Sequence, residues 1–157
     1  NVCVFSPVNA DILIDVSGYY SAAAPSRFSA VVPDRVMDTR QGIGPSGRLA
    51  GGQVVELPLP KAPNGATGAM LNVTTINPDF AGYVTVFPCG ATPPTSSVNP
   101  AAGDVRPNTV TTALSANRSL TAGTNRSERQ TGSSRVSVVT CTVVSVGVRG
   151  AGRARRG

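Results

Sequence analysis

The sequence predicts an all-β protein, an antiparallel β-sandwich or jelly-roll-like single domain with a poorly ordered basic tail at its C-terminal end. Apolar residues in several segments recur at every second position, which is the period of a half-buried strand. No window of residues 1–117 places apolar residues at helical spacing over three turns. The 13 prolines and 17 glycines interrupt the 157-residue chain often, which favours short strands joined by turns.

Residues 1–20 are predicted to form a β-hairpin. Apolar residues alternate on both sides of a turn-rich stretch at residues 6–9, most clearly in residues 12–16 (ILIDV), and Gly18 ends the pattern. The chain opens inside this pattern without an initiator methionine or a leader sequence, so we expect a fragment or a processed chain. Residues 21–27 are small and polar, as in a linker.

The next elements are predicted to be short. Residues 28–32 form an apolar stretch that Pro33 is expected to stop, and residues 34–40 are a separate candidate strand. A glycine-rich loop follows over residues 41–52, and residues 54–59 form a short strand between prolines.

The clearest hairpin is predicted to join residues 69–76 to residues 82–87. Both stretches are β-prone, and the Asn-Pro-Asp sequence at residues 77–79 between them is typical of a turn. Residues 97–99 are a candidate edge strand, and residues 109–114 a further strand.

Charge divides the chain unevenly. The net charge of +6 arises in residues 118–157, which hold eight arginines against Glu128, whereas residues 1–117 carry a net charge of −1. The body therefore lacks the basic surface that binds nucleic acid. Within the arginine-rich part, residues 136–148 are β-prone and residues 149–157 are expected to be disordered.

The composition also limits the chemistry. The chain has no histidine, which excludes Ser-His-Asp and Cys-His mechanisms and imidazole metal ligands. The carboxylates show no spacing that implies a glycosidase pair. The longest apolar run is well below the ~18 residues of a membrane span. We expect no enzyme activity, no cofactor, no metal site and no membrane span.

Several linked stretches form a recognisable pattern. They are Phe28 with residues 33–40 (PDRVMDTR), residues 71–74 (LNVT), residues 82–83 with 86–90 (GY and VFPCG), residues 97–99 (SVN) and residues 108–110 (NTV). Together they resemble a repeat module of secreted and surface proteins of actinobacteria and similar high-GC bacteria, found in tandem or beside hydrolase domains. The resemblance covers about three quarters of the chain and implies a secreted or cell-surface location, without an established activity.

The resemblance implies a division of the chain. The module's closing strands match residues 2–6 (VCVFS) and 11–19 (DILIDVSGY), so residues 1–20 resemble the end of a preceding module. Residues 21–27 are then a linker, residues 28–117 the module body, and residues 118–157 an arginine-rich tail that departs from the pattern, whether authentic or produced by a shifted reading frame.

Displaced closing strands suggest a fold-back. Residues 1–20 are expected to enter the slot that the body's own closing strands leave vacant, as in a circular permutation. Cys3 would then stand where the module's late cysteine normally lies and could form a disulfide with Cys89. The competing interpretation puts residues 136–148 in the slot.

Two sets of candidate site residues follow. Asp38 and Arg40 alternate onto one strand face and could form a ligand site. A charged pair in a sheet is usually structural, so we interpret them as paired with each other and with Asp15 or Arg35. Stacking against a sugar ring is the second possibility, although the chain has no tryptophan. The residues that could provide it are Tyr19, Tyr20, Phe80 and Tyr83.

These observations leave three functional hypotheses. The first is a non-catalytic extracellular module for structure, spacing or adhesion, whose partners are neighbouring modules of the same parent chain. The second is an accessory domain of a secreted hydrolase that binds a glycan or the cell wall. The third is that the basic tail binds nucleic acid or an anionic surface, a role weakened by its lack of aromatic stacking partners.

Overall fold

The structure is a computed structural model, and it describes residues 5, 7, 13–16, 26–44, 47–126 and 138–149. The described residues form strands and connecting turns and include no helix. The seven strands are β1 (Ser26–Asp38), β2 (Val54–Pro58), β3 (Ala66–Ile76), β4 (Gly82–Phe87), β5 (Val105–Ala113), β6 (Ser119–Arg126) and β7 (Val138–Arg149). The all-β prediction is therefore confirmed for this part of the chain.

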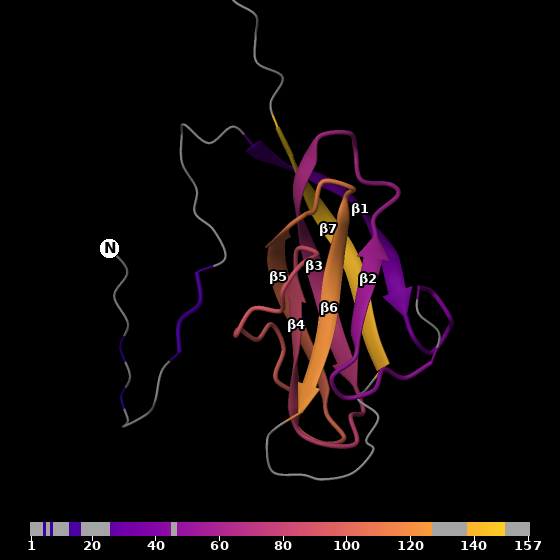
Figure 1. The fold of residues 1–157 in the computed structure, drawn as a ribbon, viewed down its shortest axis with the longest axis vertical. Coiled ribbons are helices and arrows are strands. Elements are labelled where there is room, and N and C mark those ends of the chain that lie inside the picture. The colour runs from indigo at the N-terminus through magenta and orange to yellow at the C-terminus, as the bar shows by residue number, and fades with distance from the viewer. Residues whose placement is uncertain are drawn as a thin grey trace, which may run out of the picture.

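The strands make two antiparallel sheets that lie one in front of the other (Figure 1). One has the order β1-β7-β3-β5 and the other the order β2-β6-β4. Strands with odd numbers all belong to the first sheet and strands with even numbers to the second. Each described strand therefore pairs only with strands that are not its neighbours in sequence, and the chain changes sheet at every connection.

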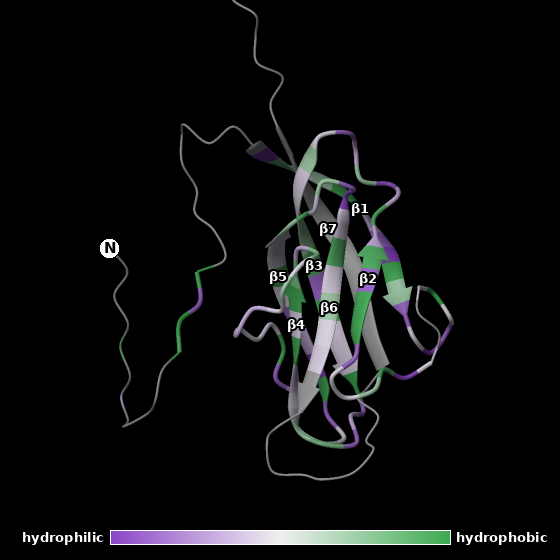
Figure 2. Ribbon diagram, in the orientation of Figure 1, coloured by the Kyte–Doolittle hydropathy of each residue, from purple (hydrophilic) through white to green (hydrophobic). Residues whose placement is uncertain are grey.

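Among the described residues, a hydrophobic cluster draws its side chains from both sheets. In β2 the buried residues Val55 and Leu57 alternate with exposed ones, and in β3 the buried residues fall on every second position from Ala69 to Thr75. Figure 2 shows the resulting hydrophobic bands on β2 and β4. The buried members are Met37, Leu49, Val55, Leu57, Leu59, Ala62, Ala66, Ala69, Leu71, Val73, Val84, Val86, Val98, Val110, Leu120 and Ala122.

The first strand runs through the proline that was expected to stop it. β1 continues from Ser26 to Asp38, and its register against β7 shifts between Ala30 and Asp34. Pro33 lies in this irregular stretch of an edge strand, where a proline removes no ladder hydrogen bond. The predicted break between residues 28–32 and 34–40 is therefore wrong, because the irregularity accommodates the proline.

The predicted hairpin of residues 69–76 with residues 82–87 is also wrong. Both strands exist, but β3 pairs with β5 and β7, whereas β4 pairs with β6 in the other sheet. The turn between them bonds to the segment before β5 instead: the Asn77 amide donates to the Asp104 carbonyl at 2.7 Å, and the Gly103 amide to the Pro78 carbonyl at 2.7 Å.

The outer edge of β4 is covered by residues 97–98. The Val84 amide donates to the Val98 carbonyl at 2.8 Å, and the Val98 amide returns a bond to the Val84 carbonyl at 3.1 Å. This contact is an isolated bridge, shorter than the strand expected at residues 97–99. The strand expected at residues 109–114 is longer than predicted and is β5.

Residues beyond 117 complete both sheets, in contrast to the expected tail. β6 is the central strand of its sheet, and Leu120 is fully buried there. β7 lies between β1 and β3. Residues 138–149 therefore pair with β1 and β3, whereas residues 13–16 belong to no strand, and Leu13, Ile14 and Val16 are exposed. The remainder of the expected disordered stretch, residues 150–157, lies outside the described residues.

The central place of β6 leads to a prediction about stability. Replacing Leu120 with alanine should lower the free energy of unfolding by about 2–5 kcal/mol, because it opens a cavity in the shared core. Urea denaturation followed by circular dichroism measures this change. Val105→Ala is the control: Val105 is 61% exposed on β5, so the change should stay within about 0.5 kcal/mol. Equal effects of the two substitutions would contradict the position of β6.

Candidate functional site

The carboxylate of Asp38 is fully buried at the end of β1 and is held by two arginines. Its Oδ1 accepts hydrogen bonds from Arg40 Nε at 3.0 Å and from the Arg40 amide at 3.1 Å. Its Oδ2 accepts from Arg40 Nη2 at 2.8 Å and from Arg35 Nη1 at 3.1 Å. The structure thus brings together three of the four residues expected to form ion pairs, but Arg40 lies in the turn after β1 and not on the strand face that was expected. Asp15 is exposed and makes no ion pair with the described residues.

A tight loop after β1 fixes this carboxylate in place. The Asp38 amide donates to the Ile43 carbonyl at 2.8 Å, and the Asp38 carbonyl accepts from the Ile43 amide at 3.1 Å. Gly44 follows with φ +73°, and a Cβ there would lie 3.2 Å from the Val36 carbonyl oxygen. The loop therefore needs a glycine at this position, both for its backbone angle and for its close approach to β1.

The arginines also determine the ionisation of Asp38. The hydrogen bonds from the Arg40 side chain lower the pKa of Asp38 to about 2; burial opposes this, while the Arg40 amide and the charges of both arginines reinforce it. The same contact raises the pKa of Arg40. A carboxylate held so firmly in its charged form is poorly suited to exchange protons near neutral pH.

A second polar cluster lies on the outer face of β2 and β6, and the sequence analysis did not foresee it. The Ser119 hydroxyl lies within hydrogen-bond distance of four neighbours. They are Glu56 Oε1 at 2.5 Å, Asn117 Oδ1 at 2.7 Å, Ser115 Oγ at 2.8 Å and Cys89 Sγ at 3.2 Å. The β2–β6 ladder, which sets Glu56 opposite Thr121 and Pro58 opposite Ser119, creates this cluster from residues far apart in sequence.

This second cluster combines a carboxylate, hydroxyls and a thiol that come from three parts of the fold. Hydrogen bonds from Ser119 first, then Cys89 and Asn117, lower the pKa of Glu56. Ser119 is only 2% exposed, so its hydroxyl is closed to a substrate. The cluster instead links β2, β6 and the loop after β4.

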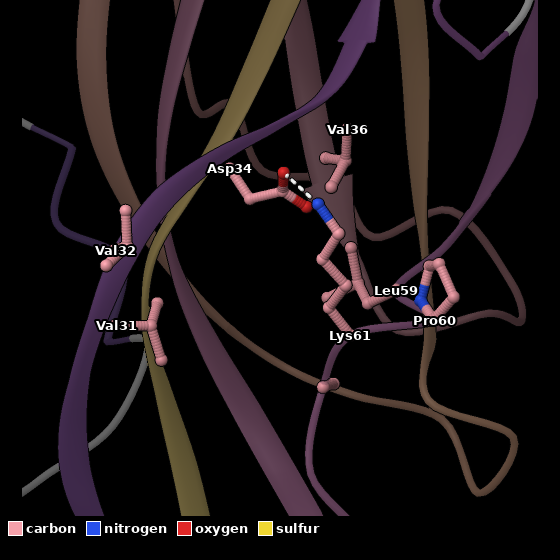
Figure 3. Close-up of a pocket in the computed structure, with 8 residues that line it drawn as sticks. Val31, Val32, Asp34, Val36, Leu59, Pro60 and Lys61 are labelled. Atoms are coloured by element: carbon pink, nitrogen blue, oxygen red, sulfur yellow. Dashed lines mark hydrogen bonds and ion pairs between the residues drawn. The ribbon is translucent and has the colours of Figure 1, made fainter.

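An apolar cavity of about 230 Å³ opens beside β1 (Figure 3). Val31, Val32 and Val36 line it from β1, and the segment after β2 lines the other side. An ion pair between Lys61 Nζ and Asp34 Oδ1, 2.7 Å apart, connects the two sides. The cavity presents hydrophobic surface with one charged pair, a lining suited to aliphatic side chains.

The aromatic residues proposed to stack on a sugar are only partly within the described chain. Phe80 is 38% exposed in the connection between β3 and β4, and Tyr83 is half-buried on β4. Tyr19 and Tyr20 lie outside the described residues. The same is true of Cys3, so the predicted Cys3–Cys89 disulfide stays a prediction. Cys89 is partly buried and forms no disulfide with another described residue.

Comparisons of the chain with protein-family models, curated proteins and solved structures return no match. In the part of the chain that the structure describes, no three histidine, cysteine or acidic side chains gather as metal ligands do. A search of these same residues finds no helix with the length and hydrophobicity needed to cross a membrane.

The shifted ionisation of Asp38 predicts how stability responds to acid. The pKa of Asp38 is about 2 in the folded protein, below the value of ~3.9 expected for an unfolded chain. Its contribution is therefore present in full above pH ~4 and is lost as the pH falls through about 2. Urea denaturation at a series of pH values should show a loss of unfolding free energy over this range.

Asp38→Asn is the test of this assignment. The variant should be less stable than the wild type at pH 6, and the difference between the two proteins should shrink between pH 4 and pH 2. Glu56 and Asp104 also have lowered pKa values and contribute to the acid response of both proteins, so only the difference reports on Asp38. A difference that does not change with pH would refute the assignment.

Proposed function

We propose that the two sheets form an antiparallel β-sandwich that serves as a non-catalytic extracellular module, used for structure, spacing or adhesion. The extracellular location rests on the resemblance of residues 28–110 to a repeat module of secreted and surface proteins. The structural role rests on the way the polar side chains are used.

The supporting observation is that charged side chains form hydrogen bonds to the connections that carry the chain from one sheet to the other. Asp38 holds the loop that leaves β1, as described above. Arg48 lies in the connection between β1 and β2. Its Nη2 donates to the Asn77 carbonyl at 2.8 Å and to Asp79 Oδ1 at 2.8 Å, which fixes the connection from β3 to β4. Arg118 Nη1 donates to the Ala62 carbonyl at 2.8 Å, which links the connection between β5 and β6 to the connection between β2 and β3.

This use of charge favours a scaffold over a reactive site. A catalytic carboxylate needs access to substrate and a pKa suited to proton transfer. Asp38 is buried and strongly ionised, and Glu56 is bonded to a buried hydroxyl. Their partners stabilise the connections on which the pairing of distant strands depends.

A role in glycan binding is the second candidate. Phe80 and Tyr83 lie three residues apart at the start of β4, and Phe80 is 38% exposed. Aromatic rings of this kind stack on the apolar faces of sugars. The whole chain would then act as an accessory domain whose catalytic partner lies elsewhere.

One experiment separates these roles. The whole chain is incubated with purified bacterial cell walls and with a panel of insoluble polysaccharides, and both the bound protein and the released sugar are measured. The structural proposal predicts that no sugar is released and that any retention on cell walls or polysaccharides does not depend on Phe80 or Tyr83. Sugar release would overturn the non-catalytic assignment.

Variants decide the outcome if binding is seen. Retention that falls at least tenfold in Phe80→Ala and Tyr83→Ala, but not in the control Val105→Ala, would replace the structural proposal with the glycan-binding role. Retention that disappears above ~0.2 M salt in all proteins alike would show electrostatic attraction to the basic residues instead.

A further inference from the structure

We propose that Asn64 is a self-modification site, at which the side-chain amide is lost by deamidation and the new carboxylate forms an ion pair with Arg118. The reaction needs the Asn64–Gly65 sequence and water, and no enzyme. Its product adds charge to a contact that links the connection between β2 and β3 to the connection between β5 and β6.

The sequence supplies one reactive pair of this kind. Asn64–Gly65 is the one asparagine–glycine pair in the chain. Deamidation begins when the backbone nitrogen of the following residue attacks the side-chain amide carbon of asparagine, and glycine hinders that attack least because it has no Cβ. Every other asparagine precedes a residue with a side chain, among them Asn72, Asn108 and Asn117.

The turn before β3 leaves the reacting atoms accessible. Asn64 and Gly65 are both exposed, and the Ala66 amide donates to the Pro63 carbonyl at 3.1 Å to close a four-residue turn around them. The Gly65 amide donates no hydrogen bond to another described residue, so its nitrogen is available for the attack. A Cβ at Gly65 would meet nothing within 4 Å, which shows that the turn has space for a cyclic intermediate.

Arg118 reaches the same side chain from the other connection. Its Nη1 donates to Asn64 Oδ1 at 3.1 Å and to the Ala62 carbonyl at 2.8 Å. Arg118 forms no ion pair with the described residues, so neutral oxygen atoms hold its charge. Oδ1 is also the atom on which negative charge develops when the Gly65 nitrogen adds to the amide carbon, and a donor aimed at it stabilises that step.

The chemistry exchanges one nitrogen for another and then adds water, without oxidation or reduction. The Gly65 nitrogen gives its proton to water and bonds to Asn64 Cγ, and the Cγ–Nδ2 bond breaks as Nδ2 takes a proton from water and leaves as ammonia. Water then opens the five-membered imide. Opening at Cγ gives aspartate with the main chain restored, whereas opening at the main-chain carbonyl gives isoaspartate, in which the main chain runs through the side chain.

The two products have opposite effects on the contact. Aspartate keeps the turn and places a carboxylate oxygen where Oδ1 now accepts from Arg118, and such a charge-assisted bond is stronger than a neutral one. An exposed pair of this kind should raise the folding equilibrium constant about 1.4- to 5-fold. Isoaspartate lengthens the main chain within the turn, so the bond from the Ala66 amide to the Pro63 carbonyl loses its geometry.

This modification is independent of the proposed extracellular role, because it needs neither a partner nor a particular compartment. The assay of binding and hydrolysis does not report on it, and the two experiments below do not report on binding.

The first experiment follows the reaction itself. The whole chain is incubated in neutral and mildly alkaline buffer, and peptide mapping by mass spectrometry measures the conversion of each asparagine. Asn64 should convert first, ahead of the exposed residues Asn72, Asn108 and Asn117. Gly65→Ala should slow the conversion, because a methyl group hinders the attacking nitrogen. Conversion of Asn64 no faster than that of the other three, or no slower in Gly65→Ala, would overturn the modification site.

The second experiment tests the role of Arg118. Asn64→Asp makes the aspartate product directly, and urea denaturation should find it more stable than the wild type at low salt. The difference should disappear at ~1 M salt, which screens exposed charges. It should also disappear in an Arg118→Gln background, as measured by a double-mutant cycle. The salt series decides the question if Arg118→Gln does not fold.

A matched variant controls for the added negative charge. Asn99→Asp makes the same change at an exposed asparagine whose side chain bonds to Ser96, and it should not reproduce the gain. An equal gain in Asn99→Asp, no gain in Asn64→Asp at low salt, or a gain that persists without Arg118 would overturn the ion pair.

Discussion

The structure depends on one constraint: each connection between consecutive strands carries the chain from one sheet to the other. Neither sheet can form from adjacent segments, because every ladder joins strands separated by at least one strand of the opposite sheet. Closing these long loops costs conformational entropy. Burial of the apolar cluster that both sheets share, which includes Leu71, Val84 and Leu120, offsets that cost. Sheet formation and core formation are therefore one event, and non-local pairing of this kind makes folding slow.

Several polar side chains stabilise the connections that carry the chain between the sheets. A chain that leaves a sheet must turn without stranding backbone groups in the interior. The buried carboxylate of Asp38 organises the turn after β1, Arg48 spans from that connection to the turn after β3, and Ser119 gathers the groups at the start of β6. These contacts hold the connections between the two sheets in defined conformations. The carboxylates of Asp38, Asp79 and Glu56 are therefore held by contacts within the fold.

The sequence was informative where the signal is local. β-prone composition and flanking turn residues indicated the strands that contain residues 54–59, 69–76 and 82–87, and the placement of Asp38 and Arg40 indicated an ion pair. Pairing could not be predicted, since a turn sequence such as Asn77-Pro78-Asp79 suits a crossing as well as a hairpin. The contact of Glu56 with Ser119 left no signal because the ladder that creates it joins distant segments. The arginine-rich composition of residues 118–157 led to the prediction of a tail where β6 lies. The apolar residues Leu120 and Ala122, which are buried, are the sequence signal for this strand.

The central claim is that residues 119–126 belong to the same cooperative unit as the rest of the body. Hydrogen–deuterium exchange of the whole chain, resolved by residue, tests it most directly, because strands in one core open together. The account predicts that the amides of Leu120, Ala122 and Thr124 in β6 exchange as slowly as those of Leu71 and Val73 in β3. Exchange in β6 at the rate of an unstructured peptide, with β3 still protected, would contradict it.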